Sequence, residues 1–272
     1  MGKIIAVFNQ KGGVGKSTTA VNVSAYLSLK QKTTLLIDLD PQSNATTSCG
    51  LVRGKLTKSI YEVLTDSSQP DEAILQHQSL NGFFILPSGS GLSLFEQNIS
   101  QIADKELILK RICEQIRNKF DVIIIDCPPS LGLLTVNALS AADVVLIPVQ
   151  CEYLALEGLS ALIHAVRAVK HEQNPSLEVG GIVLTMTDFR ANLTKEVAEE
   201  VKRFFQGLVF DTQIPRNVRL AECPSFGKPI CLYDPTSAGA VAYRQLTEEV
   251  CERILKRVES PAATLPPAAA AA

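Results

Sequence analysis

A short segment near the N-terminus combines three glycines, two lysines and two hydroxyl side chains, a set suited to holding phosphate. It reads Gln10-Lys11-Gly12-Gly13-Val14-Gly15-Lys16-Ser17-Thr18. The segment follows an apolar run at 4–8 and opens a predicted helix over 17–30. Between a strand and a helix N-terminus, backbone N–H groups and the helix dipole together attract an anion. We therefore predict that residues 11–18 bind a nucleotide, with Lys16 on its β- and γ-phosphates and Ser17 on Mg²⁺.

The spacing differs at one position from the common phosphate-binding loop. The pattern G-x-x-x-x-G-K-[ST] has glycine where this chain has Gln10, and a second lysine, Lys11, follows. The form K-G-G-x-G-K-[ST] is the deviant Walker A sequence of one class of NTPases, so the departure narrows the class. A glycine turn without a ligand is the alternative interpretation, but such a turn does not require two lysines.

Acidic residues follow two further apolar runs that we predict to be strands. Asp38 and Asp40 come at the end of the run 33–38, and Asp126 ends the run 121–126. In open parallel sheets, ligands bind at the carboxyl ends of the strands. We assign Asp126 to Mg²⁺ through a water, name Asp38 as a second metal candidate, and place Asp40 near the γ-phosphate. The alternative for each aspartate is a helix cap or a turn.

Composition limits the kind of protein this is. The chain has 272 residues, of which 46% are hydrophobic and 20% charged, with a formal net charge of −2. No apolar run approaches the roughly 18 residues needed to cross a bilayer, and the N-terminus lacks the layout of a signal peptide. Seven scattered cysteines without a C-x-x-C pair favour reduced thiols in a cytosol over disulfides or zinc.

Apolar runs alternate with amphipathic stretches, which predicts an α/β fold with a doubly wound, mostly parallel sheet flanked by helices. Several runs are apolar throughout, as in strands buried on both faces. We expect one domain over 1–258, and over 259–272 a disordered Pro/Ala-rich tail or a cloning remnant. The predicted strands are 3–8, 33–38, 83–86, 121–126, 144–149, 179–186 and 209–214, and the predicted helices are 17–30, 105–119, 131–141, 154–173, 193–206 and 236–258.

Six segments together resemble the ParA/Soj family of chromosome and plasmid partition ATPases. The first is shared with MinD and the nitrogenase iron protein, whereas the later ones point to the Soj-like branch. The resemblance covers residues 1–257 in the same order throughout. The segments are 11–18, Asp38–Asn44, Asp126–Gly132, Pro148–Tyr153, Ile214–Arg219 and Gly227–Ile230.

The resemblance implies a face-to-face homodimer that encloses ATP and Mg²⁺. Lys11 resembles the lysine that reaches the partner's phosphates, and Asp40 resembles the carboxylate that positions the attacking water; with Lys16 they form the expected catalytic set. Pro215 and Asn217 resemble the adenine-contacting loop, although a proline also fixes an ordinary turn. The early motifs hold no glutamate base and no arginine finger, which favours slow hydrolysis stimulated by a partner.

The resemblance also implies non-specific binding of double-stranded DNA by the ATP dimer, and a ParB-type centromere-binding protein as partner. Arg190 and Arg219 match the positions of DNA-binding arginines, and contacts of this kind weaken steeply with salt. Relatives often carry basic residues after Tyr-Asp-Pro, whereas this chain has Thr236 to Gly239, which weakens the expected patch. The expected location is the cytoplasm, on the nucleoid, without membrane contact.

Three alternatives remain open at this point. A MinD-like membrane regulator needs a basic amphipathic C-terminal helix with bulky anchors, and the stretch 242–258 has no aromatic anchor. An iron–sulfur electron carrier needs cysteines in another sequence context than Cys127 and Cys151. A metabolic relative that uses ATP on a small molecule fits the early motifs equally well, because they report the nucleotide and not its acceptor.

Overall fold

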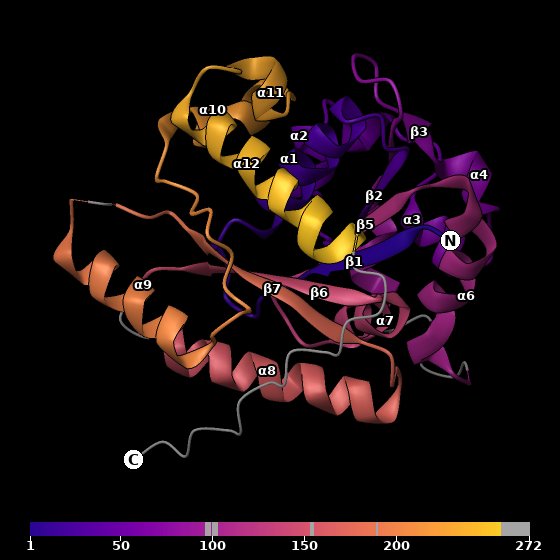
Figure 1. Ribbon diagram of the computed structural model, residues 1–272. Coiled ribbons are helices and arrows are strands. Elements are labelled where there is room, and N and C mark those ends of the chain that lie inside the picture. The colour runs from indigo at the N-terminus through magenta and orange to yellow at the C-terminus, as the bar shows by residue number, and fades with distance from the viewer. Residues whose placement is uncertain (96–98, 100–102, 153–154, 189, 257–272) are drawn as a thin grey trace.

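Seven strands form a single sheet in the order β3-β4-β2-β5-β1-β6-β7 (Figure 1). The computed structural model describes residues 1–95, 99, 103–152, 155–188 and 190–256. Every neighbouring pair of strands is parallel except β3 with β4, which confirms the predicted doubly wound, mostly parallel α/β fold. The strands are β1 (Lys3–Val7), β2 (Thr34–Asp38), β3 (Leu75–Gln76), β4 (Phe83–Leu86), β5 (Val122–Asp126), β6 (Val144–Gln150) and β7 (Glu178–Thr185).

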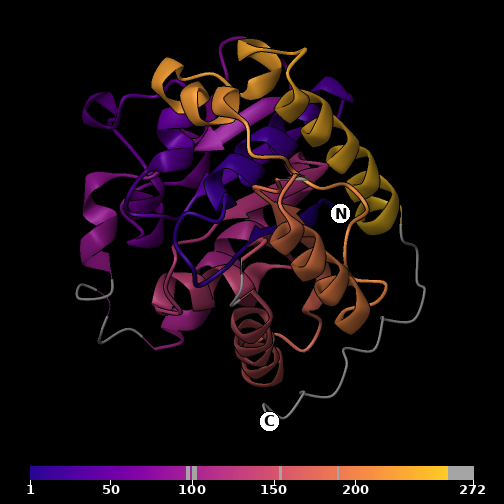
Figure 2. The same ribbon diagram turned by 90° about the vertical axis from the view of Figure 1, so that its left-hand side faces the viewer.

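Helices cover both faces of the sheet, and two views at right angles show the layers (Figures 1 and 2). On one face the core is built against α3 (Ile60–Leu64), α6 (Ile108–Ile116), α7 (Leu133–Ala141), α8 (Ala155–Glu172) and α9 (Asn192–Phe204). On the other face it is built against α1 (Lys16–Leu29), α2 (Asn44–Ser48), α10 (Val218–Phe226), α11 (Ile230–Tyr233) and α12 (Ala238–Val250). The short α4 (Pro70–Ala73) precedes β3.

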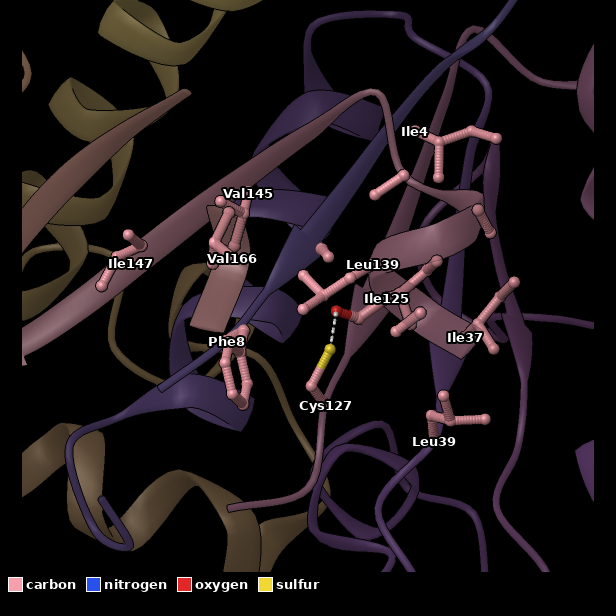
Figure 3. Packing of buried hydrophobic residues seen from close by; sticks show 14 of the residues in the cluster. Ile4, Phe8, Ile37, Leu39, Ile125, Cys127, Leu139, Val145, Ile147 and Val166 are labelled. Carbon is pink, nitrogen blue, oxygen red and sulfur yellow. Dashed lines mark hydrogen bonds between the residues drawn. The ribbon is translucent and has the colours of Figure 1, made fainter. Parts of the chain in front are cut away.

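The central strands are apolar on both faces because each face is covered by helices. Figure 3 shows one side of this core, where Phe8, Ile37 and Ile125 lie against Leu139 of α7 and Val166 of α8. In the same view the buried Cys127 thiol donates a weak hydrogen bond to the carbonyl oxygen of Ile125, 3.8 Å away. Cys127 is fully buried, and this burial raises the pKa of its thiol, as expected for a side chain that packs in the core.

Strand register sets the position of the acidic residues. Asp126 at the end of β5 lies level with Asp38 at the end of β2 and with Val7 at the end of β1. Adjacent strands are about 4.8 Å apart. The loop 8–15 leaves β1 at this same edge, so two carboxylates and the glycine-rich loop meet there.

The predicted strand over 209–214 is wrong. The segment forms no continuous ladder within the described residues. Isolated bridges join Ile182 with Val209 and Thr187 with Pro215, and single backbone hydrogen bonds run from Phe210 to Ile182 and from Ile214 to Leu184. Between them the chain leaves the sheet edge, because the Glu249 carboxylate accepts hydrogen bonds from the backbone N–H groups of Asp211 and Thr212 at 2.9 and 2.8 Å. A side chain of α12 thus satisfies two adjacent backbone donors between the bridges.

Other boundaries shift by local chemistry. The predicted helix 105–119 is α6 flanked by 3₁₀ turns at 105–107 and 117–119, and the predicted helix 236–258 is α12 followed by a π turn at 251–255. The short helices α10 and α11 carry no sequence prediction. The expected tail at 259–272 lies outside the described residues, and the single domain over 1–258 stays a prediction. No helix in the described part of the chain combines the length and apolarity needed to cross a bilayer.

Candidate functional site

The glycine-rich loop presents an open helix N-terminus. Gly13 and Gly15 have φ angles of 77° and 89°, a left-handed conformation that side chains disfavour. Helix α1 begins directly after Gly15, with no acidic residue in its first turn and no side-chain cap. Thr185, at the end of β7, holds the loop by donating a hydrogen bond to the carbonyl oxygen of Val14 at 2.9 Å. The free N–H groups of this turn can therefore bind an anion such as phosphate.

Lys16 lies inside this loop rather than in solvent. Its side chain is buried, and Nζ donates a hydrogen bond to the carbonyl oxygen of Lys11 at 3.0 Å, across the loop. Burial lowers the pKa of Lys16, while the nearby charges of Asp126 and Asp40 act in the opposite direction. Burial removes hydration from this ammonium group and so disfavours its charged form. A phosphate bound at the neighbouring helix N-terminus would stabilise the charged form.

Asp126 is the most unusual group of the site. It has 0% exposure, and neither of its carboxylate oxygens has a hydrogen bond of ordinary geometry to any described residue. Burial raises its pKa well above the ordinary value and the Asp38 carboxyl adds to this, while the nearby Ser17 hydroxyl and Lys16 oppose it. A buried carboxylate without partners needs another cation or ordered water to be stable.

The oxygen groups at this edge fit Mg²⁺. The ion prefers hard oxygen ligands and usually takes one or two carboxylates together with waters and substrate phosphates. The Asp126 carboxylate and the Ser17 hydroxyl supply that chemistry. The described residues hold no group of three or more histidine, cysteine or acidic side chains that could bind a metal by themselves. This agrees with an ion that brings its remaining ligands with it.

Asp38 is occupied within the protein. Its Oδ2 accepts hydrogen bonds from the N–H and hydroxyl of Thr46 at 2.7 and 2.6 Å, and its Oδ1 accepts one from the N–H of Asp40 at 3.2 Å. Burial raises the pKa of Asp38 to about 6, and the two Thr46 bonds oppose that shift. In this arrangement Asp38 positions the turn that carries Asp40 and the start of α2. Its role as a metal ligand stays a prediction.

Asp40 stands in the tight turn that follows β2. It is 5% exposed; its Oδ1 accepts a hydrogen bond from the N–H of Gln42 at 2.9 Å, and its backbone oxygen accepts one from the Ser88 hydroxyl at 2.7 Å. Its charge raises the pKa of Lys16, which places the carboxylate beside the loop. The structure therefore brings together Lys16, Ser17, Asp126 and Asp40 at one edge of the sheet.

Lys11 is directed elsewhere. Its Nζ forms an ion pair with Oε2 of Glu152, which follows β6, and both side chains are about half exposed. Its backbone N–H donates to Asn9 Oδ1 at 3.0 Å, and Asn9 is in turn anchored to the carbonyl of Pro148. The amine of Lys11 thus lies at the partly exposed surface beside Glu152, whereas the amine of Lys16 is buried in the loop. Glu152 carries no prediction from the sequence, because it lies 141 positions from its partner.

A pocket of about 180 Å³ adjoins the loop on the side of α10. Its walls include Gly15 and Thr18 of the loop together with Pro215 and Asn217. Asn217 also caps α10 by accepting a hydrogen bond from the N–H of Leu220 at 3.3 Å. A group connected to phosphates on the loop can reach this pocket, which suits the base of a nucleotide. A larger hollow between the loop 211–215 and α12 is lined by four acidic residues and would repel phosphates.

Similarity to known proteins narrows the class further. A family model described as an AAA domain matches residues 2–179. The chain is 49% identical over 250 residues to the sporulation initiation inhibitor protein Soj of Bacillus subtilis, covering 92% of this chain and 98% of that protein. It is 48% identical to the chromosome partitioning protein ParA of Myxococcus xanthus, covering 93% and 89%. The chain belongs to the Soj/ParA family of chromosome-partitioning ATPases.

A solved structure of a Mycobacterium smegmatis protein confirms the fold. That protein, named cobyrinic acid a,c-diamide synthase, was solved with bound ADP and magnesium. It superposes with a TM-score of 0.83 at 34% identity and covers 97% of this chain and 100% of its own. The Soj/ParA chain described here therefore shares its fold with a protein that binds a nucleotide and this metal.

The two predicted DNA-binding arginines of this Soj/ParA protein are exposed but already paired. Arg190 makes a two-bond ion pair with Asp188, with both N–O distances at 3.0 Å. Arg219 lies between Glu222 at 3.0 Å and Asp234 at 3.3 Å. The backbone N–H of Thr187 donates to Ile214 and its carbonyl accepts from Arg216, so the loop that carries Arg190 is joined to the segment that leads into α10 and Arg219. Each arginine must leave, or share, an acidic partner before it binds a phosphate.

Proposed function

We propose that this chain is an ATP-dependent switch that partitions chromosomes or plasmids. In this proposal it binds ATP with Mg²⁺, dimerises around the nucleotide, and binds double-stranded DNA without sequence preference as a dimer. The observation that carries the nucleotide part is the buried Asp126 carboxylate, without hydrogen bonds of its own, beside Lys16 at an open helix N-terminus. Family membership supports the partition role.

Each residue has a stated task in this proposal. The N–H groups of 12–18 and the Lys16 ammonium bind the phosphates, and the pocket beside Pro215 and Asn217 takes the adenine. Ser17 holds Mg²⁺ directly and Asp126 holds it through a water, and the ion neutralises charge on the phosphate oxygens when bound. Asp40 orients the attacking water. Lys11 leaves Glu152 and reaches the phosphates of the partner subunit.

The proposal extends to regulation and location. Hydrolysis is slow in the isolated protein, since the early motifs lack a glutamate base and an arginine finger, and a ParB-type protein accelerates it. The single domain over 1–258 acts in the cytoplasm on the nucleoid. These statements rest on the family and on the sequence pattern.

The test is binding of random-sequence duplex DNA with ATP, with ADP and without nucleotide, across a salt series. Binding only with ATP, weakened by salt and lost in Arg219→Glu, supports the proposal. The variant Lys11→Ala should bind nucleotide as a monomer but fail to dimerise, and Asp40→Ala should accumulate as a stable ATP dimer. If no nucleotide state binds DNA, even in Asp40→Ala at low salt, the DNA role is refuted while the ATPase role stands.

A second candidate is an ATP-dependent metabolic enzyme, favoured by the name of the Mycobacterium smegmatis neighbour. That neighbour is less similar to this chain than the partition proteins, at 34% against 49% identity. The two candidates differ in what accelerates ATP hydrolysis. DNA together with a ParB-type protein should do so for a partition switch, and a small carboxylic acid with an amide donor for the enzyme.

A further inference from the structure

Two segments that are far apart in the sequence are held together by a contact between two glycines. Gly50 follows α2, and Gly227 ends α10; their φ angles are 79° and 60°. A Cβ on Gly227 would lie 2.6 Å from Cα of Gly50, and one on Gly50 would lie 2.9 Å from the oxygen of Gly227. No side chain fits between these backbones, so the loop after α2 and the end of α10 form one continuous surface. Figure 1 shows α2 beside α10 and α11.

Positive charge gathers on both sides of this contact. Arg53 and Lys55 lie in the 3₁₀ turn that follows Gly50, and Lys228 follows Gly227; all three are exposed. None of them forms an ion pair with an acidic side chain in the part of the chain that the structure describes. Arg53 donates to a neutral group, the carbonyl oxygen of Gly89, at 3.2 Å. These three charges are therefore available to an anionic partner.

This availability distinguishes the three residues from the arginines named earlier. Arg190 and Arg219 each have an acidic partner within hydrogen-bond distance. Breaking such an ion pair offsets part of the free energy that a phosphate contact gains, whereas a cation without an acidic partner gives up its hydration and, for Arg53, one bond to a neutral carbonyl. A cation near duplex DNA contributes by releasing the counterions that the phosphates hold. We therefore expect Arg53, Lys55 and Lys228 each to contribute more to the free energy of DNA binding than an arginine that must first leave an acidic partner.

We propose that Arg53, Lys55 and Lys228 form a second phosphate-binding patch for duplex DNA, at the opposite end of α10 from Arg219. The proposal rests on the DNA-binding function proposed above and assigns it a further site. Arg219 and Lys228 lie at opposite ends of α10, whose nine residues span about 13 Å. Duplex DNA carries a phosphate charge about every 1.7 Å of its axis, so one duplex can contact both ends of the helix. Two exposed apolar side chains from the same segments, Val52 and Phe226, add surface that a bound partner would cover.

The experiment measures binding of a random-sequence duplex to the full chain with a non-hydrolysable ATP analogue, as a function of salt. The patch variant carries Arg53→Gln, Lys55→Gln and Lys228→Gln. Its log–log salt slope should fall in magnitude by about 0.9 for each lost contact, hence up to roughly 2.7 per subunit and 5.4 per dimer, and its affinity at 0.1 M salt should fall by at least on the order of 100-fold. Because none of the three residues belongs to the nucleotide site, nucleotide-dependent dimerisation and basal ATP hydrolysis should match wild type. Lys228→Gln alone should lower the slope by about 0.9 per subunit, or about 1.8 per dimer, which tests the proposal if the triple variant folds poorly.

The matched control removes the same number of positive charges at the opposite end of the sheet, where the parallel strands begin. Lys3 is the first residue of β1, and Lys32 lies just before β2. Burial raises the pKa of the Cys251 thiol, and Lys32 and Lys256 both lie close enough to Cys251 to oppose that shift. The control set is therefore Lys3→Gln, Lys32→Gln and Lys256→Gln. This control should keep the wild-type slope. An unchanged slope in the patch variant, or an equal loss in the control, overturns the patch while the DNA function stands.

Two further outcomes separate the patch from its alternatives. If wild type hydrolyses ATP but binds no duplex in any nucleotide state, both the DNA function and the patch are refuted. A parallel sedimentation experiment uses vesicles of phosphatidylglycerol. If the patch variant loses vesicle binding while its DNA binding is unchanged, the three cations face a lipid surface and the proposal is overturned.

Discussion

Replacing Glu152 by glutamine is expected to tighten the nucleotide-dependent dimer. In this structure the Lys11 ammonium is paired with the Glu152 carboxylate of its own subunit. In the proposed dimer the same ammonium reaches the partner's phosphates, so the pair within the subunit must break first. Glutamine keeps the size of the side chain and removes the charge. The variant therefore releases Lys11 without removing it.

The structure limits how large the effect can be. The Lys11 and Glu152 side chains are 54% and 42% exposed, so solvent screens the pair. Exposed pairs of this kind contribute about 0.2–1 kcal/mol. Two lysines are released per dimer, which makes about 0.4–2 kcal/mol, or roughly a 2-fold to 30-fold lower dissociation constant. Added salt should reduce the gain, because screening already weakens the pair in wild type.

Sedimentation equilibrium with a non-hydrolysable ATP analogue measures the dissociation constant of the dimer directly. The control is Glu157→Gln, since Glu157 lines the same hollow beside Lys11 without forming an ion pair with it. Glu157→Gln should leave the constant unchanged, and Lys11→Ala should abolish the dimer. A weaker dimer in Glu152→Gln would refute the reasoning, because it would mean that the Glu152 carboxylate itself binds the partner subunit.

Three further predictions concern the folded chain without nucleotide. Ser43 has a φ of 58°, and its buried hydroxyl has no hydrogen-bond partner among the described residues. Ser43→Gly should therefore raise the free energy of unfolding, measured by urea titration, by about 1 kcal/mol. Ser43→Ala keeps the backbone strain and should raise that free energy by less. Gly227→Ala should lower the free energy of unfolding by at least about 1 kcal/mol, because the new Cβ would clash with the backbone of Gly50. An unchanged urea midpoint would contradict the glycine contact. Burial raises the pKa of Asp38 to about 6, so the folded state binds a proton more tightly than the unfolded state, and this group lowers stability as pH rises from about 4 to about 6. Asp38→Asn should remove that part of the pH dependence, and an unaltered profile would place the titration on another group.

Local patterns in the sequence predict most of the fold and the centre of the site. The glycine spacing at 12–15 predicts the loop, and apolar runs that end in aspartate predict the edge where Asp38 and Asp126 lie level. Parallel strands buried on both faces are continuous apolar runs, which makes them easy to identify in a sequence. Six of the seven predicted strands are confirmed. These features depend on residues that are close together in the chain.

Contacts between distant residues account for what the sequence does not predict. The segment 209–214 has the composition of a strand, but the Glu249 carboxylate takes two of its N–H groups. The pairing of Lys11 with Glu152, and of Asp38 with Thr46, likewise depends on how separate turns meet in space. Helix α10 is short and contains Pro224, so its periodicity is too brief to identify. No local pattern reports such contacts.

The carboxylate of Asp126 also makes the lifetime of the protein depend on its ligand supply. A buried acid that forms no well-aligned hydrogen bond to the described residues lowers the stability of the empty protein, and a cation that binds it only in the folded chain restores that stability. Stabilisation by a ligand grows with the logarithm of its concentration, by about 2.7 kcal/mol at one hundred times the dissociation constant. In a cell, the fraction of unfolded chains open to proteases would then rise as ATP and Mg²⁺ fall. Energy shortage would thus remove the protein itself as well as stop its cycle.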